Sequence, residues 1–250
     1  MSSKEELFAA LILLHSGLER QGPGDAAFTK QMIGLLPPLP EAPRIADLGC
    51  GSGTVSLLLA EHFNAPVTAV DLCRAFLDQA EAAAKARGLG HLLRVVEADM
   101  GNFGGAAESI DLLWSEGAAY NLMFQGAVEA WRPLMAPGGV AVISELSWFV
   151  DSPPAPIREY WEAAYPAVAS EAVNAERAMA AGFEVLGVHR LPSAAWWENY
   201  YGPLQARIAE LKPDAGDAMS HVIAETEDEI ARFAEYGEVY GYSFYLLRAV

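Results

Sequence analysis

The chain has 250 residues, of which 52% are hydrophobic and 20% charged, a composition that can bury a substantial core and excludes global disorder. Acidic residues (33) outnumber Lys and Arg (16), so the formal net charge is −17, which argues against an electrostatic grip on nucleic acid or on an anionic membrane surface. Two cysteines, Cys50 and Cys73, support neither a disulfide framework nor a zinc set. These features predict a single cytoplasmic domain, an enzyme or a binding protein, without a metal site.

The first 40 residues are expected to form a helical segment ahead of the main fold. The apolar run at residues 7–14 is too short to span a membrane, and the acidic residues before it argue against a signal peptide. Ser3 and Glu6 have the spacing of a capping box, which predicts a short buried helix. A turn at residues 21–25 and a second helix at 26–36 follow, and the proline-rich stretch 37–43 is a stiff connector.

Strand-like and helix-like segments alternate from residue 44 to residue 145. This alternation predicts a mostly parallel sheet with helices on both faces. The expected strands are 44–48, 67–71, 92–97, 110–114 and 140–145, and the expected helices are 54–63, 73–87 and 121–135, with a turn at 137–139.

The last hundred residues have a different pattern. A broken helical stretch at 154–181 precedes a strand at 183–189, and an antiparallel strand at 242–249 closes a seven-stranded sheet. Between them an insertion of about residues 191–240 has helical character, with one helix at 206–211 and a second opened by a capping box of Thr226 and Glu229. Insertions of this length usually build a binding site or an oligomer contact, so any homodimer is expected to form through these helices.

The sharpest motif is the glycine loop D-x-G-x-G-x-G at residues 47–53, between a strand and a helix. Its glycines allow a tight turn and a close approach to a ligand. Thr54 stands where the dinucleotide fingerprint needs its last glycine, which argues against a nicotinamide cofactor, and no Walker lysine follows. Asp71 and Asp99 end the next two strands, so three carboxylates are predicted in one row at the carboxyl edge of the sheet. Asp71 there suits the two hydroxyls of a ribose, and Asp99 an exocyclic amine; helix capping is the plainer alternative for each.

Five segments in this order resemble the motifs of the class I S-adenosylmethionine-dependent methyltransferases, and two of them further resemble a bacterial branch that acts on small molecules. The segments are IADLGCGSG (45–53), VTAVD (67–71), EADM (97–100), IDLLWSEGAAYN (110–121) and APGGVAVISE (136–145). The resemblance implies a Rossmann-like fold, with residues 1–40 as a lid, 41–150 as the cofactor-binding core and 151–250 as the acceptor side.

The resemblance also implies a role for each matching position. The backbone of the glycine loop would hold the methionine part of the cofactor, Asp47 would reach its ammonium group, and Leu72 would pack on adenine. Met100 would offer a backbone N–H, and the turn at residues 21–24 would close over the methionine carboxylate. The cofactor-binding residues expected are Asp47, Gly49, Cys50, Gly51, Gly53, Asp71, Leu72, Asp99, Met100 and Ser115.

The methyl acceptor is expected to be a small molecule whose nitrogen or oxygen nucleophile attacks the methyl carbon in line with the sulfonium sulfur that leaves. Glu116 and Tyr120 follow the fourth strand, where the transferred methyl should point, and are the expected catalytic residues: Glu116 as a base and Tyr120 as a positioning group. The aromatic residues expected to bind the acceptor are Trp148, Trp196, Trp197 and Tyr200. Two alternatives remain open from the sequence: a non-catalytic S-adenosylmethionine-binding protein and a nicotinamide-dependent oxidoreductase.

Overall fold

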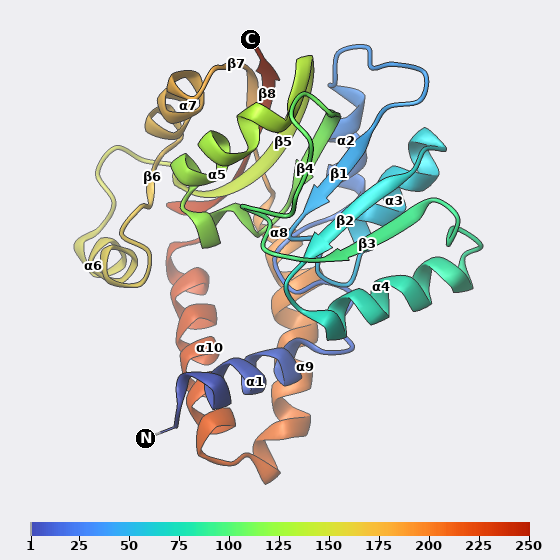
Figure 1. Cartoon of the computed structure of the whole chain (residues 1–250). Coiled ribbons are helices and arrows are strands. Elements are labelled where there is room, and N and C mark those ends of the chain that lie inside the picture. Colours follow the sequence, from blue (N-terminus) through green and yellow to red (C-terminus); the bar gives the residue numbers. More distant parts are fainter. Residues whose placement is uncertain (1) are drawn as a thin grey trace.

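The computed structural model describes residues 2–250 and shows a single mixed sheet flanked by helices (Figure 1). Seven strands lie in the order β3-β2-β1-β4-β5-β8-β7, and the two-residue β6 pairs with β5 off this path. β1 to β5 are parallel, whereas β8 is antiparallel to β5 and β7. The strands are β1 (Ile45–Leu48), β2 (Val67–Asp71), β3 (Leu93–Glu97), β4 (Ile110–Ser115), β5 (Met135–Trp148), β6 (Ala169–Ser170), β7 (Phe183–Arg190) and β8 (Tyr240–Ala249). The predicted Rossmann-like sheet is confirmed, with one extra short strand.

The helices cover both faces of this sheet and extend beyond one of its edges (Figure 1). They are α1 (Lys4–His15), α2 (Ala26–Gly34), α3 (Thr54–Phe63), α4 (Arg74–Ala86), α5 (Phe124–Trp131), α6 (Ala155–Ala164), α7 (Glu171–Ala180), α8 (Ser193–Trp196), α9 (Gly202–Leu211) and α10 (Asp217–Tyr236), with a π-helical turn at Trp197–Tyr201. α2 and α3 contribute to the core on one face of the sheet, and α5 and α7 to the core on the other. No helix within residues 2–250 is both long enough and apolar enough to cross a membrane.

Three helices form a layer below the carboxyl ends of β1 and β2 (Figure 1). α9 and α10 extend away from the sheet there, and α1 lies across them and contacts both. The capping box of α1 is confirmed: the Ser3 side chain accepts from Glu6 N, and the Glu6 side chain accepts from Ser3 N. The helix is only half buried, since Phe8 and Leu11 are exposed while Leu14 is fully covered. The N-terminal segment is thereby brought over the edge where parallel α/β sheets bind ligands.

The structure corrects three local predictions. The expected helix 121–135 is interrupted at Met123, whose φ of 58° ends a 3₁₀ turn, so α5 begins only at Phe124. Residues 136–139 bulge within β5 and do not form a separate turn, because Met135 already pairs with Ile110 of β4. Thr226 does not open a helix: it lies inside α10 and its hydroxyl donates to Val222 O, which satisfies it without a cap.

Candidate functional site

A cavity of about 490 Å³ lies at the carboxyl edge of the sheet, between the ends of β1, β2, β3 and β4 and the helices α1 and α10. The sequence-predicted residues that line it come from both the cofactor and the acceptor sets. They are Asp47, Gly49, Cys50, Gly51, Asp71, Leu72, Asp99, Met100, Glu116, Tyr120 and Tyr200. The row of carboxylates predicted from strand ends therefore meets in one cavity.

The glycine loop has the close approaches that its sequence predicts. Gly49 has a φ of 76°, and a Cβ there would lie 2.2 Å from the Ala118 Cβ. Gly51 has a φ of 52°, and a Cβ would lie 2.5 Å from the Gln21 side-chain oxygen. Both positions are in the left-handed region, where a side chain is also strained by its own backbone. Gly53 serves packing, because a Cβ would meet Ala80 of α4 at 2.6 Å. Only glycine fits at these positions.

Asp71 organises the loop as well as facing the cavity. One carboxylate oxygen accepts from Gly51 N at 2.8 Å, and the other accepts from Cys73 N at 2.8 Å. Each carboxylate oxygen has more than one lone pair, so each retains acceptor capacity on the cavity side. Asp99 is arranged similarly, with one oxygen accepting from Gly101 N at 2.8 Å. Both carboxylates are thus held in fixed positions.

Asp47 is the most deeply buried acid of the row. Its carboxylate accepts from the Ser56 hydroxyl at 2.5 Å, and burial raises the pKa of Asp47 to about 7. Burial likewise raises the pKa of the neighbouring Cys50 thiol, with the charges of Asp47 and Asp71 adding to the effect. Cys50 therefore stays a thiol at neutral pH, which fits a small residue in the loop and not a nucleophile.

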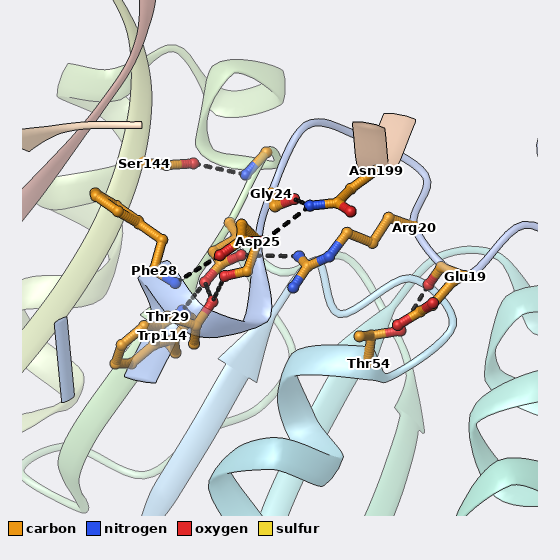
Figure 2. A network of polar contacts seen from close by, with 12 residues as sticks. Glu19, Arg20, Gly24, Asp25, Phe28, Thr29, Thr54, Trp114, Ser144 and Asn199 are labelled. Atoms are coloured by element: carbon orange, nitrogen blue, oxygen red, sulfur yellow. Dashed lines mark hydrogen bonds and ion pairs between the residues drawn. The ribbon is translucent and has the colours of Figure 1, made fainter. Parts of the chain in front are cut away.

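The N-terminal segment is docked on the glycine loop. Ser52 N donates to the Gln21 side-chain oxygen at 2.9 Å, and the hydroxyls of Ser52 and Thr54 both donate to Glu19 O, at 2.9 and 2.6 Å. Thr54, which stands where the dinucleotide fingerprint has its last glycine, therefore has a structural role. It ties the segment before α2 to the start of α3 (Figure 2).

Glu116 accepts hydrogen bonds from Arg20, Thr29 and Trp114, three residues that are labelled in Figure 2. One of its oxygens accepts from the Thr29 hydroxyl at 2.8 Å and from Trp114 Nε1 at 2.9 Å. The other pairs with Arg20 Nη1 at 3.1 Å, and the two side chains are only 9% and 5% exposed. Both carboxylate oxygens of Glu116 therefore accept from donors of the protein itself, and these contacts anchor the N-terminal segment. The role of Glu116 as a base stays a prediction.

A second clamp on this segment comes from the π-helical turn Trp197–Tyr201. The Asn199 side-chain amide donates to Gly24 O and to the Asp25 carboxylate, both at 3.0 Å (Figure 2). Asp25 in turn caps α2 by accepting from Phe28 N at 2.7 Å. Glu116 at the end of β4 therefore contacts residues on both sides of the turn before α2, namely Arg20 and Thr29. Asn199 of the C-terminal insertion contacts the turn itself.

The far end of the cavity is built from three different elements. Tyr120 follows β4, Tyr200 lies on the π-helical turn, and Glu229 lies on α10; all three line the cavity together with His15 of α1. Burial raises the pKa of the Tyr120 phenol, and the charges of Glu229 and Glu145 add to that effect. Arg20, His15 and Glu229 carry no local sequence signal for this site, because their partners are distant in the chain.

Besides Gly53, four predicted residues do not line the cavity. Ser115 is fully buried, and its hydroxyl donates to Leu48 O at 2.8 Å, so it links β4 to β1 and does not reach the cavity. Trp148 packs edge-on against Tyr240 in the core. Trp196 stacks on Phe233 at 4.4 Å between ring centroids, and Trp197 packs against the same core. The three tryptophans are packing residues, which corrects their assignment to the acceptor; only Tyr200 of the four aromatic candidates lines the cavity.

Comparison with known proteins agrees with this architecture. Residues 45–139 match a protein family described as a methyltransferase domain. The whole chain superimposes on a methyltransferase from Geobacter sulfurreducens solved with S-adenosylhomocysteine (TM-score 0.82, 18% identity, 97% of this chain and 98% of that one). It also matches YjhP from E. coli (TM-score 0.83, 20% identity, 96% and 99%) and a methyltransferase from Thiobacillus denitrificans with S-adenosylhomocysteine (TM-score 0.81, 19% identity, 96% and 97%).

Proposed function

We propose that this chain is a class I S-adenosylmethionine-dependent methyltransferase that transfers a methyl group to a nitrogen or oxygen atom of a small-molecule acceptor. One observation carries the proposal: the glycine loop and the tyrosines Tyr120 and Tyr200 line the same cavity of about 490 Å³. Pockets for a single drug-sized ligand span about 300–1,000 Å³, so a cavity that also holds the cofactor leaves room for only a small acceptor.

The residues around the loop fit S-adenosylmethionine. Arg20 is buried and lines the cavity, yet its Nη2 has no hydrogen-bond partner within residues 2–250. An unpaired guanidinium nitrogen at this place suits the methionine carboxylate, and Asp47 suits the ammonium group, whose charge would favour the ionised form of Asp47. These two side chains would fix the amino-acid end of the cofactor.

The adenosine end is served by the residues of β2 and β3. The two oxygens of Asp71 would accept from the ribose hydroxyls, and Asp99 would accept from the adenine amine. Leu72 is largely exposed where it lines the cavity, so it offers an apolar surface for the adenine ring, and Met100 would supply a backbone N–H. Each of these assignments keeps the loop-supporting contacts of the carboxylates intact.

The bound cofactor supplies an electrophilic methyl group on a sulfonium, so the protein's main task is alignment. Holding two reactants in line can contribute about 7–11 kcal/mol to lowering a barrier, without an acid or a base. We assign Tyr120 to positioning the acceptor, because its phenol lines the cavity just after β4. Residues 1–40 act as a lid, held through Glu116 and Asn199 by the contacts described above.

Calorimetric titration tests the cofactor assignment. S-adenosylmethionine and S-adenosylhomocysteine are expected to bind with micromolar dissociation constants, about −8 kcal/mol, and NADH far more weakly. Tighter binding of NADH would favour the oxidoreductase alternative instead. Tight binding of S-adenosylmethionine without methyl transfer to any acceptor would favour a non-catalytic binding protein.

A further inference from the structure

Glu229 lines the cavity together with Tyr120 and Tyr200, and only one of its two carboxylate oxygens has a hydrogen-bond partner within residues 2–250. Its Oε1 accepts from the Tyr201 hydroxyl at 2.8 Å, which fixes the side chain. Within residues 2–250 no group donates to Oε2, and the residue lines the cavity. Burial raises the pKa of Glu229, since the charged form loses contact with water; a cation placed beside it would compensate for that loss.

The Tyr200 hydroxyl also offers only an acceptor to the cavity, because His15 of α1 accepts its proton in a hydrogen bond. His15 Nδ1 lies 2.9 Å from Leu11 O, and because a carbonyl only accepts, this nitrogen carries the proton. Burial lowers the pKa of His15, so the ring is neutral and Nε2 is an acceptor. Nε2 lies 3.2 Å from the Tyr200 oxygen, whose hydroxyl therefore donates to it. The phenol oxygen of Tyr200 has only lone pairs left for the cavity.

The π-helical turn places these groups together. Tyr200 and Tyr201 are consecutive, so one turn positions the phenol oxygen that lines the cavity and the hydroxyl that holds Glu229. Asn199, one residue earlier, holds the lid through Gly24 and Asp25. A wide π turn of this kind frequently occurs at functional sites. The same five-residue turn therefore contacts the lid through Asn199 and lines the cavity through Tyr200.

We propose that Glu229 and Tyr200 form the acceptor subsite and that the acceptor is an amine that binds as its ammonium ion. Before transfer the ammonium group gives one proton to the free oxygen of Glu229, and the nitrogen lone pair then attacks the methyl carbon as its bond to the sulfonium sulfur breaks. The proposal rests on the proposed function and names the substrate class for the same cavity. An ammonium group brings hydrogen-bond donors and positive charge to two groups that only accept, and tyrosine ring faces attract cations as well. A carboxylate or phosphate would meet lone pairs and negative charge there. Phe8 and Leu11 line the same cavity, so the rest of the acceptor contacts an apolar wall.

Calorimetry with small probes tests the subsite separately from turnover. Ethylamine, butylamine and benzylamine are titrated into protein saturated with S-adenosylhomocysteine, alongside benzyl alcohol and benzoate as neutral and anionic counterparts of benzylamine. At least one amine is expected to bind, and benzylamine at least about tenfold more tightly than the alcohol or the acid. If S-adenosylhomocysteine itself does not bind, the proposed function fails. If it binds but no amine does, or benzoate binds best, only this subsite is refuted.

Substitutions of Glu229 and Tyr200, with one control, test whether these two residues bind the amine. Glu229→Gln keeps an acceptor for Tyr201 but removes the charge, so amine affinity should fall at least about tenfold while S-adenosylhomocysteine affinity stays within about twofold. Glu225→Gln is the matched control, because Glu225 is an exposed carboxylate one turn earlier on α10 and pairs only with His221 at the surface. Tyr200→Phe removes the second acceptor and should give an intermediate loss. Amine affinity that survives Glu229→Gln unchanged would overturn the proposal.

Discussion

Arg20 of the N-terminal segment is buried against Glu116 at the end of β4, with Nη1 3.1 Å from Oε2. The pair joins the lid to the sheet beside the glycine loop, and the remaining nitrogen of Arg20, Nη2, has no hydrogen-bond partner within residues 2–250. A cation held in this way can bind the carboxylate of a ligand only while the lid is docked. We therefore expect lid closure and cofactor binding to support each other.

Glu116→Gln is expected mainly to lower the stability of the folded protein. Breaking a buried ion pair leaves an uncompensated charge and costs about 3–5 kcal/mol. The melting temperature should fall accordingly, and thermal unfolding measures it. Glu61→Gln is the control, since Glu61 pairs with Arg87 at the surface and such pairs contribute about 0–1 kcal/mol. An unchanged melting temperature together with a loss of turnover would support the role of Glu116 as a base.

Arg20→Lys should weaken S-adenosylhomocysteine binding by about tenfold, because a lysine keeps the charge but cannot satisfy Glu116 and a second carboxylate in the geometry of a guanidinium. Methylthioadenosine, which lacks the amino-acid part of the cofactor, is the control ligand. Its affinity should stay within about twofold in the same titration. Equal losses for both ligands would show that Arg20 only supports the lid.

Asp71→Ala should weaken both S-adenosylhomocysteine and methylthioadenosine by at least about tenfold, since each contains the ribose and hydrogen bonds to a charged group contribute about 1.5–3 kcal/mol. Asp78→Ala, on the exposed face of α4, is the matched control. Calorimetry measures the affinities, and a thermal melt reports the loss of the contact with Gly51 N. If stability falls while both affinities survive, Asp71 supports the loop and does not bind the ribose.

The fold and the row of carboxylates at the sheet edge could be predicted from sequence because both depend on local patterns. Each strand end is marked by its own residues, so Asp47, Asp71 and Asp99 could be placed in one row before any contact was known. The docking of the N-terminal segment and the orientation of Tyr200 depend on long-range pairs instead: Arg20 with Glu116, Asn199 with Asp25, and His15 with Tyr200.

Composition also misled the prediction of the acceptor side. Aromatic residues are frequent from Trp148 to Tyr201, yet Trp196 contacts Phe233 and Tyr242 in the core because large apolar surface is buried wherever the fold permits. Thr226 and Glu229 have capping-box spacing inside a continuous helix, where Thr226 instead donates to the carbonyl one turn back. In both cases the tertiary environment, which periodicity does not describe, decided the outcome.

Glu145 predicts a pH dependence of stability. It is 1% exposed on β5, neither oxygen has a hydrogen-bond partner within residues 2–250, and burial raises the pKa of Glu145 to about 8 from 4.5. Below pH 4.5 both the folded and the unfolded chain hold the proton. As the pH rises from there through about 8, the unfolded chain releases it first, so the free energy of unfolding falls. Asp47 contributes with the same sign up to a pH of about 7.

Glu145→Gln should flatten this decline, because the amide does not titrate. Urea denaturation between about pH 5 and pH 9 measures the difference between the wild type and the variant, which should shrink towards low pH. Glu184→Gln, at an exposed ion pair with Arg248, should keep the wild-type slope. Parallel curves for wild type and Glu145→Gln would show that Glu145 is ionised in the folded protein.

The transfer of a labelled methyl group is the most direct test that the protein methylates a small molecule. The protein is incubated with S-adenosylmethionine labelled on its methyl carbon and a pool of small molecules below about 1 kDa, and label is counted in the small-molecule fraction and on the protein itself. We expect label in a small molecule, enrichment in amines, and loss of transfer in Asp71→Ala. Tight cofactor binding with no label in any small molecule, or label only on the protein, would contradict this expectation.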